Sequence, residues 1–154
     1  MAGYWFEEFS EGQVFEHAVS RTITETDNVW FSCLTMNTQP LHIDFHKART
    51  QTDFGQPIVN SMLTQAIMIG ITVSDTTLGT TAGNLGMDNV KFPRPMFHGD
   101  SISARTTVLS VRESKSHPDK GIVSFRHEGF NQHGELVATC DRAAFMFRKP
   151  AENT

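Results

Sequence analysis

The 154-residue sequence has only two cysteines, Cys33 and Cys140, and they are not placed at the spacing of metal ligands. A zinc site or a disulfide framework is therefore not expected, because both need cysteines or histidines at short, regular intervals. Free cysteine is one of the residue types most often found in protein interiors. We expect both thiols to be buried.

The sequence also lacks a long hydrophobic run and a basic cluster. Its longest apolar run, residues 66–73, is far shorter than the roughly 20 residues that span a bilayer. The N-terminal residues MAGYWFEEF have no basic region ahead of an apolar one. Thirteen Lys and Arg against 17 Asp and Glu give a net charge of −4, without the clustered cations that follow nucleic-acid phosphates. We expect a cytoplasmic protein that binds neither nucleic acid nor membranes.

No internal repeat, low-complexity tract or linker divides the chain. The prolines and glycines are spaced as turn residues are, so they mark connections within one unit. We expect a single domain over residues 1–154, with residues 149–154 as a frayed tail.

The first half of the chain is predicted to be helical. Thr24 offers an N-cap for a helix that ends near Met36, and residues 44–50 form a short helix capped by their first residue, Asp44. The apolar residues of the first helix recur at helical spacing and are expected to face the core: Val29, Trp30, Cys33 and Leu34.

A longer helix is predicted to start at Asn60 or Ser61. Its apolar stripe consists of Met62, Ala66, Ile69, Gly70 and Val73, and it is widened by Leu63, Ile67 and Ile71. A helix that is apolar nearly all round must be wrapped by other elements.

The second half of the chain is predicted to form antiparallel strands. Residues 82–92, 100–111, 122–130 and 136–147 are separated by the turn sequences Pro-Arg-Pro, Ser-His-Pro-Asp-Lys-Gly and Asn-Gln-His-Gly. Helices followed by long strands indicate an α+β fold, with the sheet folded around the helix that starts near residue 61. The free edge of such a sheet also invites pairing with a second copy.

The segment FSCLTMNTQPLHIDFHKA, residues 31–48, is the most informative part of the sequence. Pro40 restricts the backbone between Asn37 and His42, so their side chains can be held around one small volume, about that of a water molecule. The segment resembles the motif of the MaoC-like dehydratases and (R)-specific enoyl-CoA hydratases, in which an aromatic residue and Ser are followed by Gly-Asp-x-Asn-Pro-Leu-His and by Ala six residues after the His.

Two further blocks, FGQPIVNSMLT and VKFPRPMFHGDSI, extend this resemblance over about residues 6–147. Within this family, the sequence of these blocks is most similar to the mesaconyl-CoA and itaconyl-CoA hydratases. The resemblance implies a hot-dog fold, in which a curved antiparallel sheet wraps a long central helix, and a homodimer or larger homo-oligomer. It also implies a hydro-lyase that hydrates or dehydrates a short enoyl-CoA thioester, with a branched or dicarboxylic acyl chain as one option. No cofactor is implied beyond the coenzyme A of the substrate.

Two adjacent positions depart from the family motif, because Met36 stands for the usual Gly and Asn37 for the usual Asp, and Gln39 also differs from the Asn of the motif. An amide cannot accept a proton as a carboxylate does, but it can still hold a water molecule. Histidine titrates near neutral pH, so His42 can take a proton from water and return it to the α carbon. We predict His42 and Asn37 as catalytic residues. The alternatives are a histidine that only ties the turn together, and an asparagine that ends the preceding helix in a left-handed conformation.

Four residues are predicted to contact substrate. The Ser61 N–H, at the start of the central helix, is the candidate donor to the thioester oxygen, although the Ser61 hydroxyl can instead cap the helix. Asn60 precedes it. Arg94, between two prolines, can meet a phosphate or a carboxylate, or be an exposed turn residue. Asn89 can face the ligand or the sheet surface.

Other readings of the same residues remain open. His42, Asp44 and His46 suggest a metal site, but Pro40 and the lack of a third nitrogen or sulfur ligand argue against it. A thioesterase on the same fold would use a carboxylate, for which Asp75 and Asp53 are available. A non-catalytic acyl-CoA binding protein, or a subunit that completes the site of another chain, would explain the missing Asp.

Overall fold

The computed structural model describes residues 3–151. The elements, in chain order, are η1 (Phe6–Glu8), β1 (Val14–Glu16), β2 (Arg21–Thr22), α1 (Glu25–Leu34), α2 (Pro40–Ile43), α3 (Phe45–Gln51), α4 (Ser61–Thr76), β3 (Thr81–Lys91), β4 (Ser101–Glu113), β5 (Lys120–Phe130) and β6 (Leu136–Phe147). Of the predicted tail, residues 149–151 have no regular structure, and the remainder lies outside the described residues.

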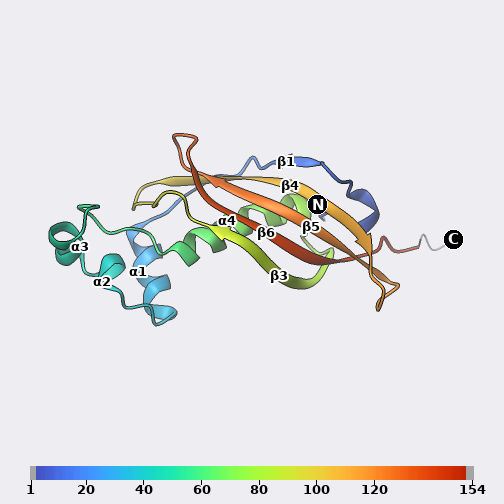
Figure 1. Ribbon diagram of the computed structural model, residues 1–154, viewed down its shortest axis with the longest axis horizontal. Coiled ribbons are helices and arrows are strands. Elements are labelled where there is room, and N and C mark those ends of the chain that lie inside the picture. Colours follow the sequence, from blue (N-terminus) through green and yellow to red (C-terminus); the bar gives the residue numbers. More distant parts are fainter. Residues whose placement is uncertain (1–2, 152–154) are drawn as a thin grey trace.

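An antiparallel sheet curves around α4 (Figure 1). Its strand order is β1-β4-β5-β6-β3, with β2 also paired to β4. The predicted α+β fold is confirmed, and each of the four long strands lies within two residues of its predicted bounds. The sequence did not predict η1, β1 and β2, because elements of two or three residues are too short to show a period.

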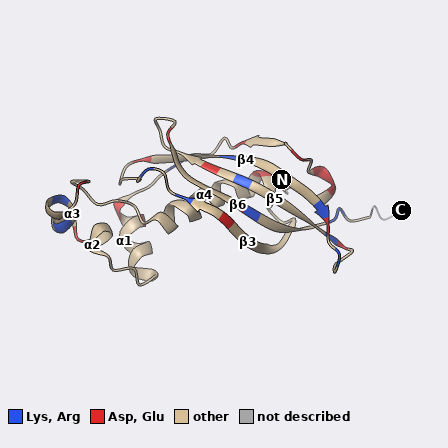
Figure 2. Cartoon of the chain, in the orientation of Figure 1, with Lys and Arg blue, Asp and Glu red and all other residues tan. Residues whose placement is uncertain are grey.

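Figure 1 shows α1, α2 and α3 beyond one end of the sheet, beside the start of α4. Within residues 3–151, no helix is both long and apolar enough to cross a bilayer. The sheet face that α4 does not cover carries paired charges, Arg105 with Glu128 at 2.9 Å and Arg126 with Asp141 at 2.7 Å. Figure 2 shows that basic and acidic positions are interspersed along these strands.

The packing of α4 corrects the predicted apolar stripe. Leu63, Ile67 and Ile71 face the sheet and form the core with Met68, whereas Met62 is 58% exposed. Ala66 and Gly70, one and two turns further on, are exposed as well. The sheet therefore wraps one side of α4, and an apolar strip of this helix remains exposed within the single chain.

Helix α1 turns its polar side toward the core, whereas the sequence predicted that its apolar side would face the core. Its capping box is formed as expected by Thr24 and Asp27, but Asn28 and Ser32 are the buried residues, whereas Trp30 and Leu34 are each 73% exposed. The polar side has the inward position because its side chains hydrogen-bond to the loops beside α4.

The cysteine prediction is half correct. Cys140 is fully buried between the sheet and α4, and burial raises the pKa of its thiol. Cys33 is exposed, because α1 turns that side of the helix outward. Both cysteines are free.

The end of α1 corrects the predicted role of Asn37 as a left-handed cap. The left-handed residue is Met36, with φ of 59°. Asn37 follows it and donates its N–H to the Ser32 carbonyl at 2.8 Å, while the Met36 N–H bonds to Cys33 at 3.1 Å. This pair of bonds is a Schellman motif, whose left-handed position is normally Gly.

Replacing Met36 with glycine should stabilise the protein. A side chain in the left-handed region costs roughly 1–2 kcal/mol, partly offset by the greater backbone entropy of Gly in the unfolded chain, so a gain of about 1 kcal/mol is expected. Urea unfolding of wild type, Met36→Gly and Met36→Ala measures this. Met36→Ala keeps Cβ and hence the strain, so equal stability of the two variants would contradict the assignment.

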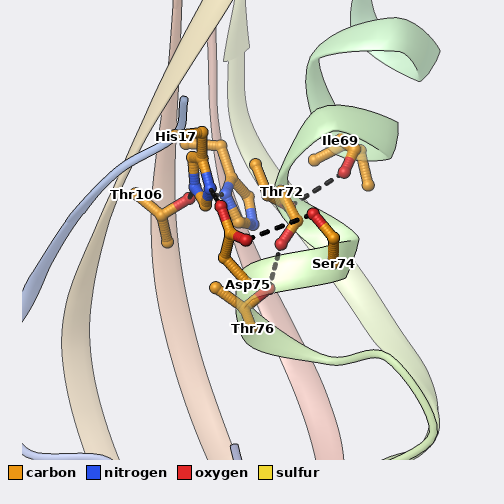
Figure 3. A network of polar contacts seen from close by, with 8 residues as sticks. His17, Ile69, Thr72, Ser74, Asp75, Thr76 and Thr106 are labelled. Carbon is orange, nitrogen blue, oxygen red and sulfur yellow. Dashed lines mark hydrogen bonds and ion pairs between the residues drawn. The ribbon is translucent and has the colours of Figure 1, made fainter. Parts of the chain in front are cut away.

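A chain of polar side chains crosses the core from Asp75 to Arg142. Figure 3 shows its Asp75 end, with His17 and Thr106. Asp75 contacts His17 Nδ1 at 2.8 Å, Thr106 Oγ1 lies 2.8 Å from both His17 Nε2 and His127 Nδ1, and Arg142 Nε bonds to His127 Nε2 at 3.1 Å. Arg142 can only donate, so His127 carries its proton on Nδ1 and Thr106 donates to His17. The bonds thus run in one direction, from guanidinium to carboxylate.

His127, in the middle of these hydrogen bonds, is fully buried. Burial, followed by the neighbouring Arg142 charge, lowers the pKa of His127 from its usual 6.5 to about 3. The imidazole is therefore neutral throughout the pH range in which most proteins are handled.

Candidate active site

His42 lies in α2, which Pro40 begins at the first helical position, where no N–H is needed. The side chain is 7% exposed. Its Nδ1 lies 2.9 Å from the Ile58 carbonyl oxygen, which can only accept, so the proton of the neutral ring is on Nδ1. Nε2 then carries the free lone pair and has no hydrogen-bond partner among residues 3–151. This tautomer is the one that a general base needs.

The start of α4 lies beside His42, through the segment Ile58–Ser61. Asn60 is the N-cap, and its side-chain oxygen accepts the Met62 N–H at 3.0 Å. The Asn60 side chain also donates to the Ser32 hydroxyl at 3.3 Å. Both ends of the Asn60 amide are thus bonded within the protein, and its contact with substrate stays a prediction.

Ser61 is the first residue of α4, and its N–H has no hydrogen-bond acceptor in the described part of the chain. An unpaired amide at a helix N-terminus, with the positive end of the helix dipole behind it, favours a negatively charged oxygen. Because Asn60 supplies the cap, the alternative role for the Ser61 hydroxyl as the N-cap is excluded.

A cleft of about 200 Å³ opens beside this helix start. It is lined by Phe54, Ile58, Val59, Ser61, Thr64, Phe92, Arg94, Pro95, Met96 and Val137. The walls are mainly apolar, and Arg94 is the only cation in this lining. Its guanidinium lies 3.5 Å from Glu135, but both side chains are substantially exposed, so this ion pair holds Arg94 weakly.

The structure does not bring Asn89 into this cleft. Asn89 has a positive φ of 52° and donates to Asp141 at 2.8 Å, beside a different hollow on the sheet. Asn37 is exposed at the end of α1, and its side-chain oxygen lies 3.4 Å from the Gln39 amide nitrogen. No bond joins Asn37 to His42 within the described residues.

The carboxylates considered for a thioesterase or a metal site have other roles. Asp75 is bonded to His17 near the far end of α4, roughly 21 Å along the helix from Ser61 at 1.5 Å per residue. Asp44 caps α3 by accepting the Lys47 N–H at 3.0 Å, and this backbone hydrogen bond lowers the pKa of its carboxyl. Asp53 is exposed. Residues 3–151 contain no group of three His, Cys, Asp or Glu side chains arranged to hold a metal ion.

Three residues beside the site were missed by the sequence reasoning: Asn28, Ser32 and His98. Asn28 and Ser32 lie one turn apart on α1, and both are fully buried. Ser32 is the Ser of the family motif, but the only sequence signal for Asn28 is that it forms a polar pair with Ser32 at helical spacing, which a rule that puts apolar residues inside assigns to solvent. His98 contacts Asn28 at 2.9 Å, from 70 positions further along the chain, and no local pattern indicates that pairing.

Comparison with known proteins agrees with this geometry. Residues 8–129 match the family model described as a MaoC like domain. The chain belongs to the MaoC-like domain family. It is 32% identical to a mesaconyl-CoA hydratase of Cereibacter sphaeroides over 136 residues, which cover 88% of this chain and 39% of that enzyme. It is 31% identical to an (R)-specific enoyl-CoA hydratase of Rhodospirillum rubrum, covering 80% of this chain and 78% of the other.

Solved MaoC-like structures share the fold. A protein from Archaeoglobus, described as a monoamine oxidase regulatory protein, superposes with a TM-score of 0.85 and 33% identity over 97% of this chain and 98% of its own. A MaoC-like dehydratase from Rhodospirillum rubrum gives 0.83 and 28% over 97% and 100%. The predicted hot-dog fold and the predicted family are confirmed. The chain spans about two fifths of the length of the mesaconyl-CoA hydratases it matches.

Proposed function

We propose that this MaoC-like protein is an acyl-CoA hydratase or dehydratase, a hydro-lyase acting on a short enoyl-CoA. The observation that carries the proposal is that His42, with Nδ1 bonded to the Ile58 carbonyl and Nε2 free, lies beside the segment that leads to the unpaired Ser61 N–H at the start of α4. Addition of water to a conjugated thioester needs a base beside the water and a donor at the carbonyl oxygen. His42 is the proposed base, and the Ser61 N–H is the proposed donor to the carbonyl oxygen.

In this mechanism His42 Nε2 takes a proton from water as the water oxygen bonds to the β carbon. The electron pair of the double bond moves to the thioester oxygen, where the Ser61 N–H and the helix dipole stabilise the enolate. The imidazolium of His42 then gives its proton to the α carbon, which completes the addition. Asn37, lacking a carboxylate, has the proposed role of orienting the water.

The acyl chain is proposed to be short, with a carboxylate as the feature that Arg94 would recognise. The cleft of about 200 Å³ and the weakly held Arg94 guanidinium support this. Several relatives are named mesaconyl-CoA hydratase and one beta-methylmalyl-CoA dehydratase. No cofactor is proposed beyond the coenzyme A of the substrate, and a cytoplasmic location is consistent with two free thiols.

We also propose a homodimer or a larger homo-oligomer. Strand β3 is an edge strand that carries exposed apolar residues, Leu85, Met87 and Val90, and the exposed strip of α4 includes Met62. An unpaired edge next to an apolar strip is a surface that a second copy can cover. Light scattering of the purified protein measures this; a monomer at micromolar concentration would contradict it.

Assays with crotonyl-, mesaconyl- and itaconyl-CoA test the proposed activity. Loss of the conjugated thioester absorbance without release of free thiol is expected, with hydroxyacyl-CoA as the product. Release of CoA thiol would indicate a thioesterase instead. Binding without turnover, also in Asn37→Asp, would indicate an acyl-CoA binding protein, and activity only with a second, different chain would indicate a partner subunit.

Ser61→Pro should lower kcat by about 10²–10³-fold, the usual cost of losing one oxyanion donor. Proline removes the N–H but suits the first position of a helix, and the preceding Asn60 already has a ψ of 125°, as a residue before proline requires. Ser61→Ala, which keeps the N–H and removes the hydroxyl, should stay within a few-fold of wild type. If Ser61→Ala were as impaired as Ser61→Pro, the hydroxyl and not the amide would be the functional group.

A further inference from the structure

Asn28 connects the two halves of the proposed site. Its side chain is fully buried, and its oxygen accepts the Asn60 N–H at 2.8 Å. Its amide nitrogen donates to the Ile58 carbonyl at 3.0 Å and lies 2.9 Å from His98 Nε2. The same Ile58 carbonyl accepts the Nδ1 proton of His42.

The chemistry of these partners fixes the orientation of the Asn28 amide. The Asn60 N–H can only donate, so the side-chain oxygen of Asn28 must face it. The Ile58 carbonyl can only accept, so the Asn28 nitrogen must face that carbonyl. The second Asn28 N–H has two neighbours, His98 Nε2 at 2.9 Å and the His42 carbonyl oxygen at 3.4 Å. Because the nitrogen of His98 is the nearer one and faces an N–H group, it has to be an acceptor. His98 is therefore neutral, with its proton on Nδ1.

Because of these bonds, the positions of His42 and Ser61 depend on Asn28, which is not itself one of the proposed reacting groups. The Ile58 carbonyl, which sets the tautomer of His42, is shared with Asn28. The Asn60 N–H, which immediately precedes the Ser61 N–H, is held by Asn28 as well. A displacement of the Asn28 side chain would alter both positions together.

We propose that Asn28 is a positioning residue for the hydratase reaction, and that neutral His98 keeps it in place, so that a proton on His98 Nε2 disorders the site. The proposal rests on the proposed function for its effect on turnover. With that proton added, two donors would face each other across 2.9 Å. Rotating the amide would not repair this, because its NH₂ group would then face the Asn60 N–H.

The surroundings of His98 shift this event to a lower pH than for a free histidine, because they lower the pKa of its imidazole. Burial lowers the pKa of His98, and the charge of Glu25 on α1 raises it by a smaller amount. The Phe45 ring packs against the imidazole, with centroids 5.6 Å apart, and carries no charge. The net direction of the pKa of His98 is downward, so burial favours the neutral imidazole that the bond to Asn28 requires.

The kinetic test compares His98→Gln with wild type. Glutamine places an oxygen where Asn28 can still donate but does not ionise. In wild type, we expect kcat to fall at acidic pH through the protonation of two groups, His42 and His98. In His98→Gln, we expect it to fall through the protonation of one group only. His46→Gln, which removes an exposed histidine of α3, is the control and should retain the wild-type profile.

Asn28→Asp is the second variant. It keeps the acceptor for the Asn60 N–H and loses both donors, so kcat should fall about 10²-fold, the scale of a displacement of about 1 Å in the site. Its carboxylate can accept from protonated His98, so its activity relative to wild type should rise as the pH falls. A merely structural role for Asn28 would lower activity by the same factor at every pH.

A readout without turnover separates this inference from the proposed function. In ¹⁵N-histidine-labelled protein, the His42 ring signals should shift a second time at the pH where His98 protonates, and this shift should vanish in His98→Gln. Its absence in wild type, or identical kinetic profiles for wild type and His98→Gln, would overturn the inference. A protein that shows the shift but hydrates no enoyl-CoA would overturn the proposed function alone.

Discussion

His42→Ala is expected to lower kcat for enoyl-CoA hydration by about 10²–10⁴-fold, the range that a positioned acid–base group supplies. Nε2 is the only free nitrogen of a ring whose other nitrogen is bonded to Ile58. The same group has to take the proton from water and return it to carbon, so its removal affects both half-steps. Initial rates with saturating substrate, followed by loss of thioester conjugation, measure the effect.

The structural contribution of His42 is separated by His42→Asn. Its side-chain nitrogen can still donate to the Ile58 carbonyl, at about the place of Nδ1, but it offers no base. We expect His42→Asn to match wild type in thermal stability and His42→Ala in rate. Equal rates in all three proteins would remove His42 from the mechanism and leave it as a residue that ties the turn to α4.

The second large effect concerns stability in acid. The pKa of His127 is lowered by burial to about 3 in the folded protein, while an unfolded chain titrates near 6.5. Between these values the unfolded state binds one more proton than the folded state, so stability is full above pH 6.5 and is lost as the pH falls toward 3. One such proton weakens folding by about 1.4 kcal/mol per pH unit, and the whole shift corresponds to about 4–5 kcal/mol.

Urea unfolding at intervals from pH 7.5 to 4.5 tests this in wild type, His127→Gln and His133→Gln. His127→Gln should be less stable at pH 7, because it disturbs the bonds to Thr106 and Arg142, but its stability should depend less steeply on pH by one proton. His133 is exposed in the turn before β6, so its loss should leave the slope unchanged. Parallel curves for wild type and His127→Gln would show that His127 does not control acid unfolding.

Local patterns predicted the elements of the fold and failed where a partner was distant. The cap of α1, the start of α4 and the four long strands follow from spacing, turn residues and period. The burial of Asn28 does not, because it depends on Asn60 and His98, which lie 32 and 70 positions away. An apolar-inward rule therefore assigns the wrong side of α1 to the core.

The sequence predicted the position of those site residues that lie in the family motif or at a helix terminus. His42 lies in the short helix that Pro40 begins, and Ser61 begins α4 as the rules of helix termini predict, while their catalytic roles stay predictions. The left-handed conformation was predicted for Asn37 but belongs to Met36. Asn adopts this conformation more readily than Met, so the sequence favoured the wrong residue. Met36 is held in it by the Schellman hydrogen bonds around it. Asn89 was predicted from its nearness to Arg94 in sequence, but an irregular end of β3 directs it toward Asp141.

The inverted polarity of α1 has a consequence for motion. The lobe formed by α1, α2 and α3 is bonded to the start of α4 through amide and hydroxyl groups. Its apolar contribution is small, because Phe31 packs against the core only partly buried and Ala48 is its one fully buried apolar side chain. Segments of this kind open at a lower free energy than a core strand does. Amide hydrogens of α1 should therefore exchange with solvent well before those of β5, and His42 would move with a unit that can lift from the central helix while the sheet stays intact.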